Sequence, residues 1–235
     1  MRRGRIMAKR KRTKLADRVL PNYTRGEEIF NMVSHIVGGG FAIIYMILCI
    51  IIAAVYGDVW GVVSSCVYGI TMVVLYCMSS IYHGLPKGTP KKVMQILDHC
   101  TIYFMIAGTY TPVILVSIRR HYPVIAWTMF GIIWGLAAIA TVFTAIDLKK
   151  YSLFSNICYL GMGWCAILFV KQTWNSIGQT AFILILAGGI AYTIGAVLYG
   201  LGKKHKYMHS VFHVLIVIGT SFQFWAIIRY VLPVK

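Results

Sequence analysis

The residues best suited to metal chemistry gather near the C-terminal end of this 235-residue chain, in the stretch HKYMHSVFH at 205–213. It places His205, His209 and His213 four residues apart at the start of an apolar segment. Residues i and i+4 of a helix lie on one face about 6 Å apart, so His209 and His213 can meet a single ion. His205 follows the sequence GKK in a loop, where histidine is commonly solvent-exposed, and we expect no ligand role for it.

Three further polar side chains stand in or beside apolar segments. His83 ends one segment in SSIYHGLP, with Ser79 one helical turn earlier on the same face, and Asp98 precedes another in QILDHCTIYF. Ionisable residues inside a membrane are costly and are therefore functional candidates. Each also has a structural interpretation: His83 as an interfacial histidine and Asp98 as a carboxylate paired with Lys91 or Lys92.

The elements that position these residues are predicted to be membrane helices. The chain is 59% hydrophobic and only 12% charged, well outside the range of soluble domains. About 20 apolar residues span a hydrocarbon core of roughly 30 Å. Seven stretches meet this test: about 29–55, 59–82, 98–118, 123–146, 152–170, 180–201 and 208–232. We predict an all-α integral membrane protein with a seven-transmembrane helical bundle (25–235), preceded by a flexible, basic cytoplasmic tail (1–24).

The distribution of charge predicts the orientation. The net charge is +17, and 18 of the 23 basic residues fall in the first 28 residues and in the loops 82–97, 147–151 and 202–207. Loops alternate between basic-rich and basic-poor, so the positive-inside rule places the N-terminus in the cytoplasm and the C-terminus outside. The tail can contact anionic lipid. It has no interleaved aromatic residues, so we expect no nucleic-acid partner.

Topology brings the candidate residues together. The second predicted span ends inside, whereas the third and seventh begin inside. His83, Asp98, His209 and His213 therefore reach the same depth on the cytoplasmic side from three helices. Three histidines with an open position are typical of catalytic zinc sites, and a nearby carboxylate can orient the attacking water or take its proton. We predict Zn²⁺ bound by His83, His209 and His213, with Asp98 as a catalytic residue.

Other titratable residues receive weaker assignments. Glu28 and His35 begin the first span on the same side, and His35 is expected to have a structural or ligand-supporting role because three histidines already complete the ligand set. His99 points about 100° away from its neighbour Asp98, and His121 lies in an outer loop. Both are expected to play no part in the site.

The chain resembles the bacterial hemolysin III family, within the superfamily of progestin/adiponectin receptors and alkaline ceramidases. The segments EEIFNMVSHIVGG, SSIYHG, LDHCTIYFMIAGTYTP and MHSVFH carry the resemblance, in the family's order, across residues 25–232. It implies seven helices around a zinc held by His83, His209 and His213, with Asp98 and Ser79 close by and catalytic. The basic tail of residues 1–24 departs from the family pattern.

Three functions follow. The first is a zinc-dependent hydrolase of the bacterial inner membrane that acts on a lipid amide or ester at a cytoplasmic-side site, ceramidase-like according to the resemblance. The second is a regulator or sensor of membrane lipid composition and fluidity, in which zinc is structural. The third is a pore-forming hemolysin. An uncleaved bundle of seven spans cannot easily leave its membrane and insert elsewhere, so we rank this last.

Overall fold

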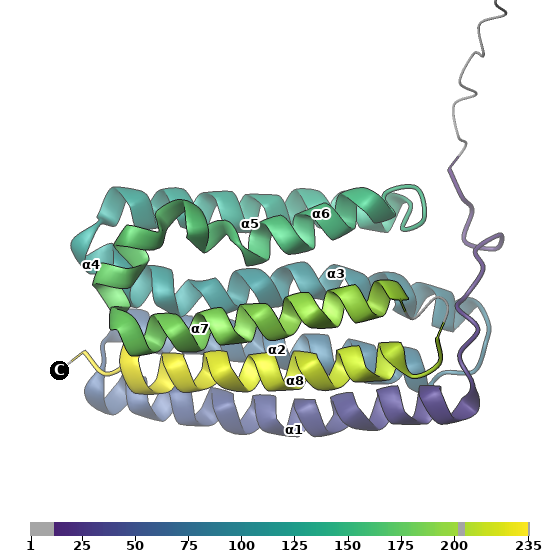
Figure 1. Cartoon of the computed structure of the whole chain (residues 1–235), viewed down its shortest axis with the longest axis horizontal. Coiled ribbons are helices and arrows are strands. Elements are labelled where there is room, and N and C mark those ends of the chain that lie inside the picture. Colours follow the sequence, from purple (N-terminus) through teal and green to yellow (C-terminus); the bar gives the residue numbers. More distant parts are fainter. Residues whose placement is uncertain (1–11, 202–204, 235) are drawn as a thin grey trace, which may run out of the picture.

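Long helices make up almost all of the computed structural model, which describes residues 12–201 and 205–234 and has no strand within these ranges (Figure 1). The α-helices are α1 (Arg25–Tyr56), α2 (Val59–Gly84), α3 (Thr89–Pro112), α4 (Arg119–His121), α5 (Pro123–Ile146), α6 (Ser152–Gly163), α7 (Val170–Leu201) and α8 (Met208–Ala226). Two π-helical segments, Val113–Ile118 and Ile227–Val231, follow α3 and α8, and a 3₁₀ segment, Cys165–Phe169, joins α6 to α7. Residues 1–11 of the predicted tail lie outside the described residues.

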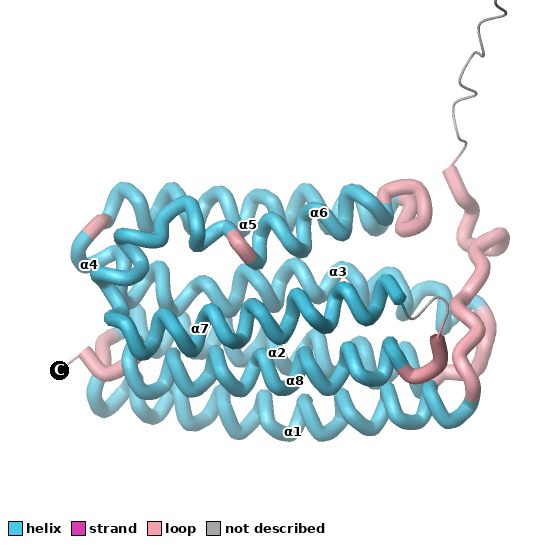
Figure 2. Tube along the Cα trace, viewed as in Figure 1, coloured by secondary structure: helices cyan, strands magenta, loops and turns pink. Residues whose placement is uncertain are grey.

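The helices run side by side, with their loops at the two ends except for a short break beside α6 (Figures 1 and 2). Helix α1 packs on α2 and α8, α2 packs on α3, and α7 packs on α8. Small residues such as Ala42, Ala53 and Ser64 are buried between helices, while Ile36 and Ile43 of α1 face outward. Small residues inside and aliphatic residues outside are typical of helices packed within lipid.

Six stretches of the described residues are long and apolar enough to cross a membrane, against seven predicted. The difference lies in Ser152–Leu201, where 50 residues form one stretch although we predicted two spans. A continuous helix of that length would extend about 75 Å, far beyond a hydrocarbon core of roughly 30 Å. Gly178 interrupts it, with φ 76° and ψ 170°, a conformation that glycine adopts readily. In Figure 1 the chain reverses direction between α6 and the part of α7 that lies beside α8.

The first turns of α1 attach this helix to the start of α8. Thr24 and Glu27 form a capping box, in which the Thr24 hydroxyl accepts from the Glu27 N–H and the Glu27 carboxylate accepts from the Thr24 N–H. The other oxygen of Glu27 accepts from the Tyr207 N–H at 2.8 Å, immediately before α8. One turn further, Asn31 Oδ1 accepts from the Ser210 hydroxyl at 2.7 Å. These contacts hold the histidine-bearing turn of α8 against α1.

Residues 12–24 lie across the same end of the bundle. The Thr13 N–H donates to Asp147 Oδ2 at 2.7 Å, and the Lys92 ammonium donates to the Ala16 carbonyl at 2.6 Å. Burial acts to raise the pKa of Asp147, but the backbone N–H groups that donate to its carboxylate outweigh burial and hold that pKa below its ordinary value. A charged Asp147 therefore fastens this segment to the bundle at neutral pH.

A close approach of the α7 and α8 backbones at Gly188 yields a stability prediction. A Cβ atom on Gly188 would lie 2.9 Å from the Gly219 carbonyl oxygen, whereas one on Gly189 would meet nothing within 4 Å. Backbone atoms cannot yield as a flexible side chain can, so Gly188→Val should destabilise the protein by about 1–3 kcal/mol. Thermal unfolding in detergent measures the effect. Gly189→Val is the matched control, and an equal loss of stability in both variants would contradict the proposed contact.

Candidate metal centre

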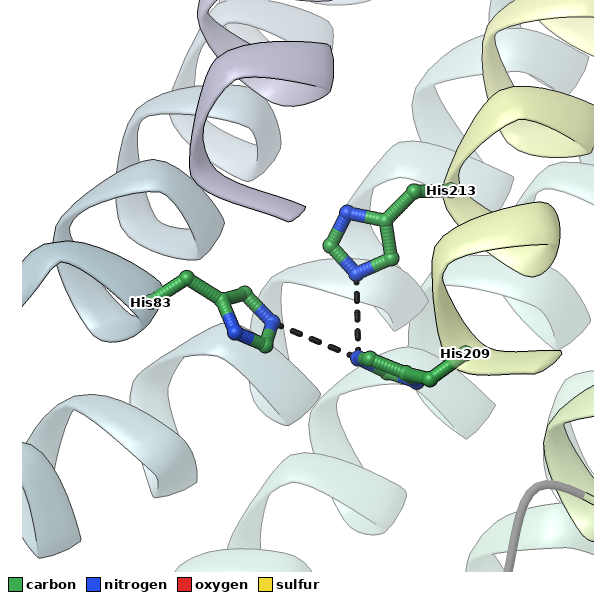
Figure 3. A group of neighbouring side chains, drawn as sticks. All are labelled: His83, His209 and His213. Atoms are coloured by element: carbon green, nitrogen blue, oxygen red, sulfur yellow. Dashed lines mark hydrogen bonds between the residues drawn. The ribbon is translucent and has the colours of Figure 1, made fainter. Parts of the chain in front are cut away.

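Three histidine side chains from two helices converge at the end of the bundle where α1 begins (Figure 3). His83 Nε2 lies 3.3 Å from His209 Nε2, which lies 3.0 Å from His213 Nε2. One ring nitrogen from each residue lies within 4.8 Å of the others. All three side chains are buried, with exposed fractions of 3% (His83), 8% (His209) and 1% (His213). The predicted ligands are thus brought together, although His83 lies 126 positions before His209 in the sequence.

The spacing of these nitrogens suits a small divalent ion. In a tetrahedral zinc site with Zn–N bonds of 2.0–2.1 Å, ligand nitrogens are about 3.3–3.4 Å apart. The separation between His83 and His209 matches this value, and the His209–His213 contact is slightly shorter. Three neutral imidazoles also form a donor set that zinc favours. The residues present therefore fit a zinc ion.

Glu28 orients His83 from the neighbouring helix. Its Oε2 atom lies 2.7 Å from His83 Nδ1, and its Oε1 atom lies 3.0 Å from the Lys91 ammonium. A carboxylate at Nδ1 holds the ring proton there and leaves the Nε2 lone pair directed at the other two histidines. Hydrogen bonds of this kind fix the tautomer of metal-binding histidines and raise their basicity.

The protons of neutral histidines cannot make both contacts within the cluster ordinary two-centre hydrogen bonds. With its proton on Nδ1, His83 can only accept at Nε2. His209 Nε2 contacts both neighbouring Nε2 atoms, yet it carries at most one proton. If His209 accepts from His213, two lone pairs face one another across the contact with His83; if His209 carries the proton on Nε2, that single proton is shared between two acceptors. A cation among the three nitrogens removes this conflict, which is the strongest structural reason to regard the cluster as a metal site.

Two aromatic rings cover the cluster. His35 of α1 stacks on His213, with ring centroids 3.7 Å apart, and Tyr23 stacks on His209 at 4.9 Å. Burial is the main cause that raises the pKa of Tyr23 above its ordinary value, and neighbouring acidic groups, Glu28 and Asp98 among them, contribute. Tyr23 therefore stays neutral and shields the cluster at the end of the bundle.

The two predicted catalytic residues lie in adjoining helices. Ser79 is buried in α2, one turn before His83. Asp98 is buried in α3, and its Oδ2 atom lies 3.5 Å from His99 Nδ1, which is hydrogen-bonded to the Gln95 carbonyl oxygen at 2.8 Å. The distances that define the histidine cluster do not include either residue. Their catalytic roles remain predictions.

The structural interpretation in which Asp98 pairs with Lys91 or Lys92 is wrong. Lys91 pairs with Glu28, and the Lys92 ammonium donates to a backbone carbonyl of residue 16. The sequence places Glu28 on this side of the membrane, and we predicted no role for it. The spacing of polar residues along α1 could have indicated a role for Glu28. Glu28 and His35 are seven residues apart, and Asn31 lies between them on the same face of the helix.

The remaining histidines, His99, His121 and His205, lie outside the cluster. His205 and His121 are exposed, and His99 bonds within its own helix. Their positions provide control substitutions for metal binding.

Comparisons with known proteins match the chain to the haemolysin-III-related family over residues 23–224. It is 36% identical to Hemolysin-3 of Bacillus cereus, across 88% of this chain and 93% of that protein. It is 34% identical to the Hemolysin-3 homolog of Bacillus subtilis (strain 168), across 90% and 98% of the two chains. Identity to the human monocyte to macrophage differentiation factor is 26%, over 74% of this chain and 72% of that protein. No solved structure matches.

Metal analysis provides the first test of the cluster. The purified protein should contain about one zinc per chain, and His83→Ala and His209→Ala should each abolish it, because two ligands do not hold zinc tightly. Inductively coupled plasma mass spectrometry measures the content after purification without added metal. His121→Ala is the control and should keep its zinc. Wild-type protein that remains free of metal after reloading would exclude the site.

The contact between Glu28 and His83 makes a second prediction. Glu28→Gln keeps an acceptor oxygen but removes the charge, and should weaken zinc binding about 10–100-fold. Competition with a chelator of known affinity measures the change. Asp58→Asn, which alters a carboxylate paired with Arg120 at the start of α2, is the matched control. Equal affinities in wild type and Glu28→Gln would show that this carboxylate does not tune the site.

Proposed function

The chain belongs to the haemolysin-III-related family, and on this premise we propose that it is a zinc-dependent hydrolase of membrane lipids, acting on an amide or ester bond. The observation that carries the proposal is the convergence of ring nitrogens from His83, His209 and His213. The Glu28 carboxylate orients the His83 ring among them. A zinc ion bound there supplies Lewis acidity, which polarises a carbonyl and makes water more acidic.

The protein's own residues would then handle the protons. Asp98 takes a proton from the attacking water at a carboxylate oxygen and returns it to the leaving nitrogen or oxygen. The carbonyl carbon gains a bond to the water oxygen and loses its bond to the leaving group, so a fatty acid and an amine or alcohol are released. Ser79 donates a hydrogen bond to the substrate carbonyl. His35 and Tyr23 limit access of bulk water through their stacking on His213 and His209.

The proposal includes seven crossings of the bacterial inner membrane, with the cluster at the cytoplasmic side. The interruption at Gly178 supports two crossings within Ser152–Leu201. Residues 12–24 and the C-terminal end lie at opposite ends of the bundle in Figure 1, as an odd number of crossings requires. The basic segments at 9–14 and 87–92 support a cytoplasmic location of the end that carries the cluster.

The strong burial of the histidine cluster favours a second candidate function, in which the zinc is structural. Structural zinc sites are closed, whereas catalytic sites keep one position open. With exposed fractions of 1–8%, the three histidines also suit a structural ion in a regulator of membrane lipid composition and fluidity. If so, cells lacking the protein should show altered acyl-chain composition, and the Asp98→Asn variant should restore it as well as wild type does. Failure of Asp98→Asn to restore it would instead favour hydrolysis.

Hydrolysis is tested with zinc-loaded protein and defined ceramides and glycerophospholipids. Released fatty acid, measured by mass spectrometry, should appear with wild type and fall about 10²–10⁴-fold in Asp98→Asn, the range expected for loss of a general base. Zinc content measured in the same samples must stay at the wild-type value, so that a lost ion does not explain the result. Absence of release from every lipid class by zinc-loaded wild type would refute the proposal.

A further inference from the structure

An apolar groove runs between α1 and α2 toward the candidate metal centre. Its volume is about 560 Å³, within the range of small-molecule sites. The lining residues on α1 run from Met32 to Ile43. The eleven steps from Met32 to Ile43, at a rise of 1.5 Å each, give a length of about 17 Å, close to half of a hydrocarbon core of roughly 30 Å. The groove is therefore as long as the space that acyl chains of one leaflet occupy.

A second pocket, of about 500 Å³, continues the groove toward the end of the bundle. Met32, Gly84 and Leu85 line both cavities, so the two share a wall. The second pocket reaches His83 and Glu28 and thus borders the metal centre. An amphipathic molecule that occupied both would pass directly beside it.

Close packing does not explain the groove. Gly38 admits the ring of Tyr76, since a Cβ atom there would lie 2.8 Å from Tyr76 Cε1. In contrast, a Cβ atom on Gly40 would meet nothing within 4 Å, although glycine is less favourable than alanine inside a helix. Gly40 leaves open space in a helix face that lipid would otherwise touch. Because Gly40 has no side chain, the groove is deeper at this position.

His35 provides a polar anchor inside the groove. It lines the cavity, is only 3% exposed, and neither ring nitrogen has a hydrogen-bond partner among the described residues. An unsatisfied buried polar group is costly unless a ligand or water completes it. Since His35 stacks on His213, a ligand carbonyl bonded to His35 would lie next to the metal centre.

The charges in the second pocket indicate the headgroup. Lys91 is neutralised by Glu28 at 3.0 Å, which leaves Arg25 and Lys87. Lys87 donates to the neutral Asn22 Oδ1 at 2.9 Å, and neither cation forms an ion pair in the part of the chain that the structure describes. Two uncompensated cations at the wide end of an apolar groove match an anionic phosphate attached to an acyl chain.

We infer that the groove and the pocket form one binding site for an anionic glycerophospholipid from the surrounding bilayer, with an acyl chain between α1 and α2, an ester carbonyl at His35 and the phosphate at Arg25 and Lys87. This inference rests on the proposed function only in naming its substrate class. The lipid enters sideways from the membrane, because residues 12–24 lie across the end of the bundle.

Binding is measured apart from hydrolysis. The full chain, zinc-loaded and delipidated in detergent, is mixed with phosphatidylglycerol or phosphatidylcholine of identical acyl chains, and retained lipid is counted by native mass spectrometry. Wild type should retain about one phosphatidylglycerol and bind it roughly tenfold more tightly than phosphatidylcholine. Gly40→Leu, which fills the groove, should weaken binding of both lipids roughly tenfold. Arg25→Ala combined with Lys87→Ala should remove only the preference for phosphatidylglycerol.

Matched variants guard against loss of folding. Gly131→Leu places the same side chain in open space on α5, and Lys149→Ala with Lys171→Ala removes the same charge elsewhere. Both controls should bind like wild type, and variants are compared only at equal zinc content and equal thermal stability. Equal retention of the two lipids by wild type, or unchanged binding by Gly40→Leu, would overturn the inference. Binding without fatty-acid release would refute only the hydrolase, whereas release from ceramide without preference for phosphatidylglycerol would refute only this site.

Discussion

The interaction on which the site depends is the contact of the Glu28 carboxylate with two other helices. Glu28 belongs to α1 and binds His83 of α2 and Lys91 of α3. A carboxylate that is 17% exposed at a membrane-spanning helix is costly unless it is paired and hydrogen-bonded. Its partners satisfy this demand and, at the same time, fix the rotation of three helices about their axes. The orientation of the His83 ring follows from the same bond.

A second set of contacts on α1 determines where α8 stands. Glu27, Asn31 and His35 recur every four residues and therefore share one face. They contact the Tyr207 N–H, the Ser210 hydroxyl and the His213 ring, in that order. The first two contacts are hydrogen bonds that satisfy polar groups which the membrane would otherwise leave without a partner, and the third stacks two rings. Helix α1 thus carries no predicted ligand, yet it positions all three.

The residues that cover the histidine cluster determine the direction from which a lipid could reach it. Residues 12–24 cover the end of the bundle, with Tyr23 stacked on His209, and His35 covers one face of His213. The continuous groove and pocket between α1 and α2 reach His35 and His83 from the side. A lipid that stays in the bilayer would therefore need no passage through water to reach the site that we propose.

The sequence by itself determined the apolar, helical character of the chain and the common location of His83, His209 and His213, but not the number of crossings within Ser152–Leu201. Hydropathy, loop charge and the four-residue period suffice for that, because each depends only on neighbouring residues. Only the tertiary structure decided that Lys91 pairs with Glu28 instead of Asp98, that Tyr23 and His35 cover the cluster, and that α1 and α2 leave a groove. These features depend on how each helix is rotated against the next, and that rotation is set by contacts between residues far apart in the chain. The local sequence pattern specifies which face of a helix is polar and which is apolar. Side chains on other helices decide which of these faces pack against each other.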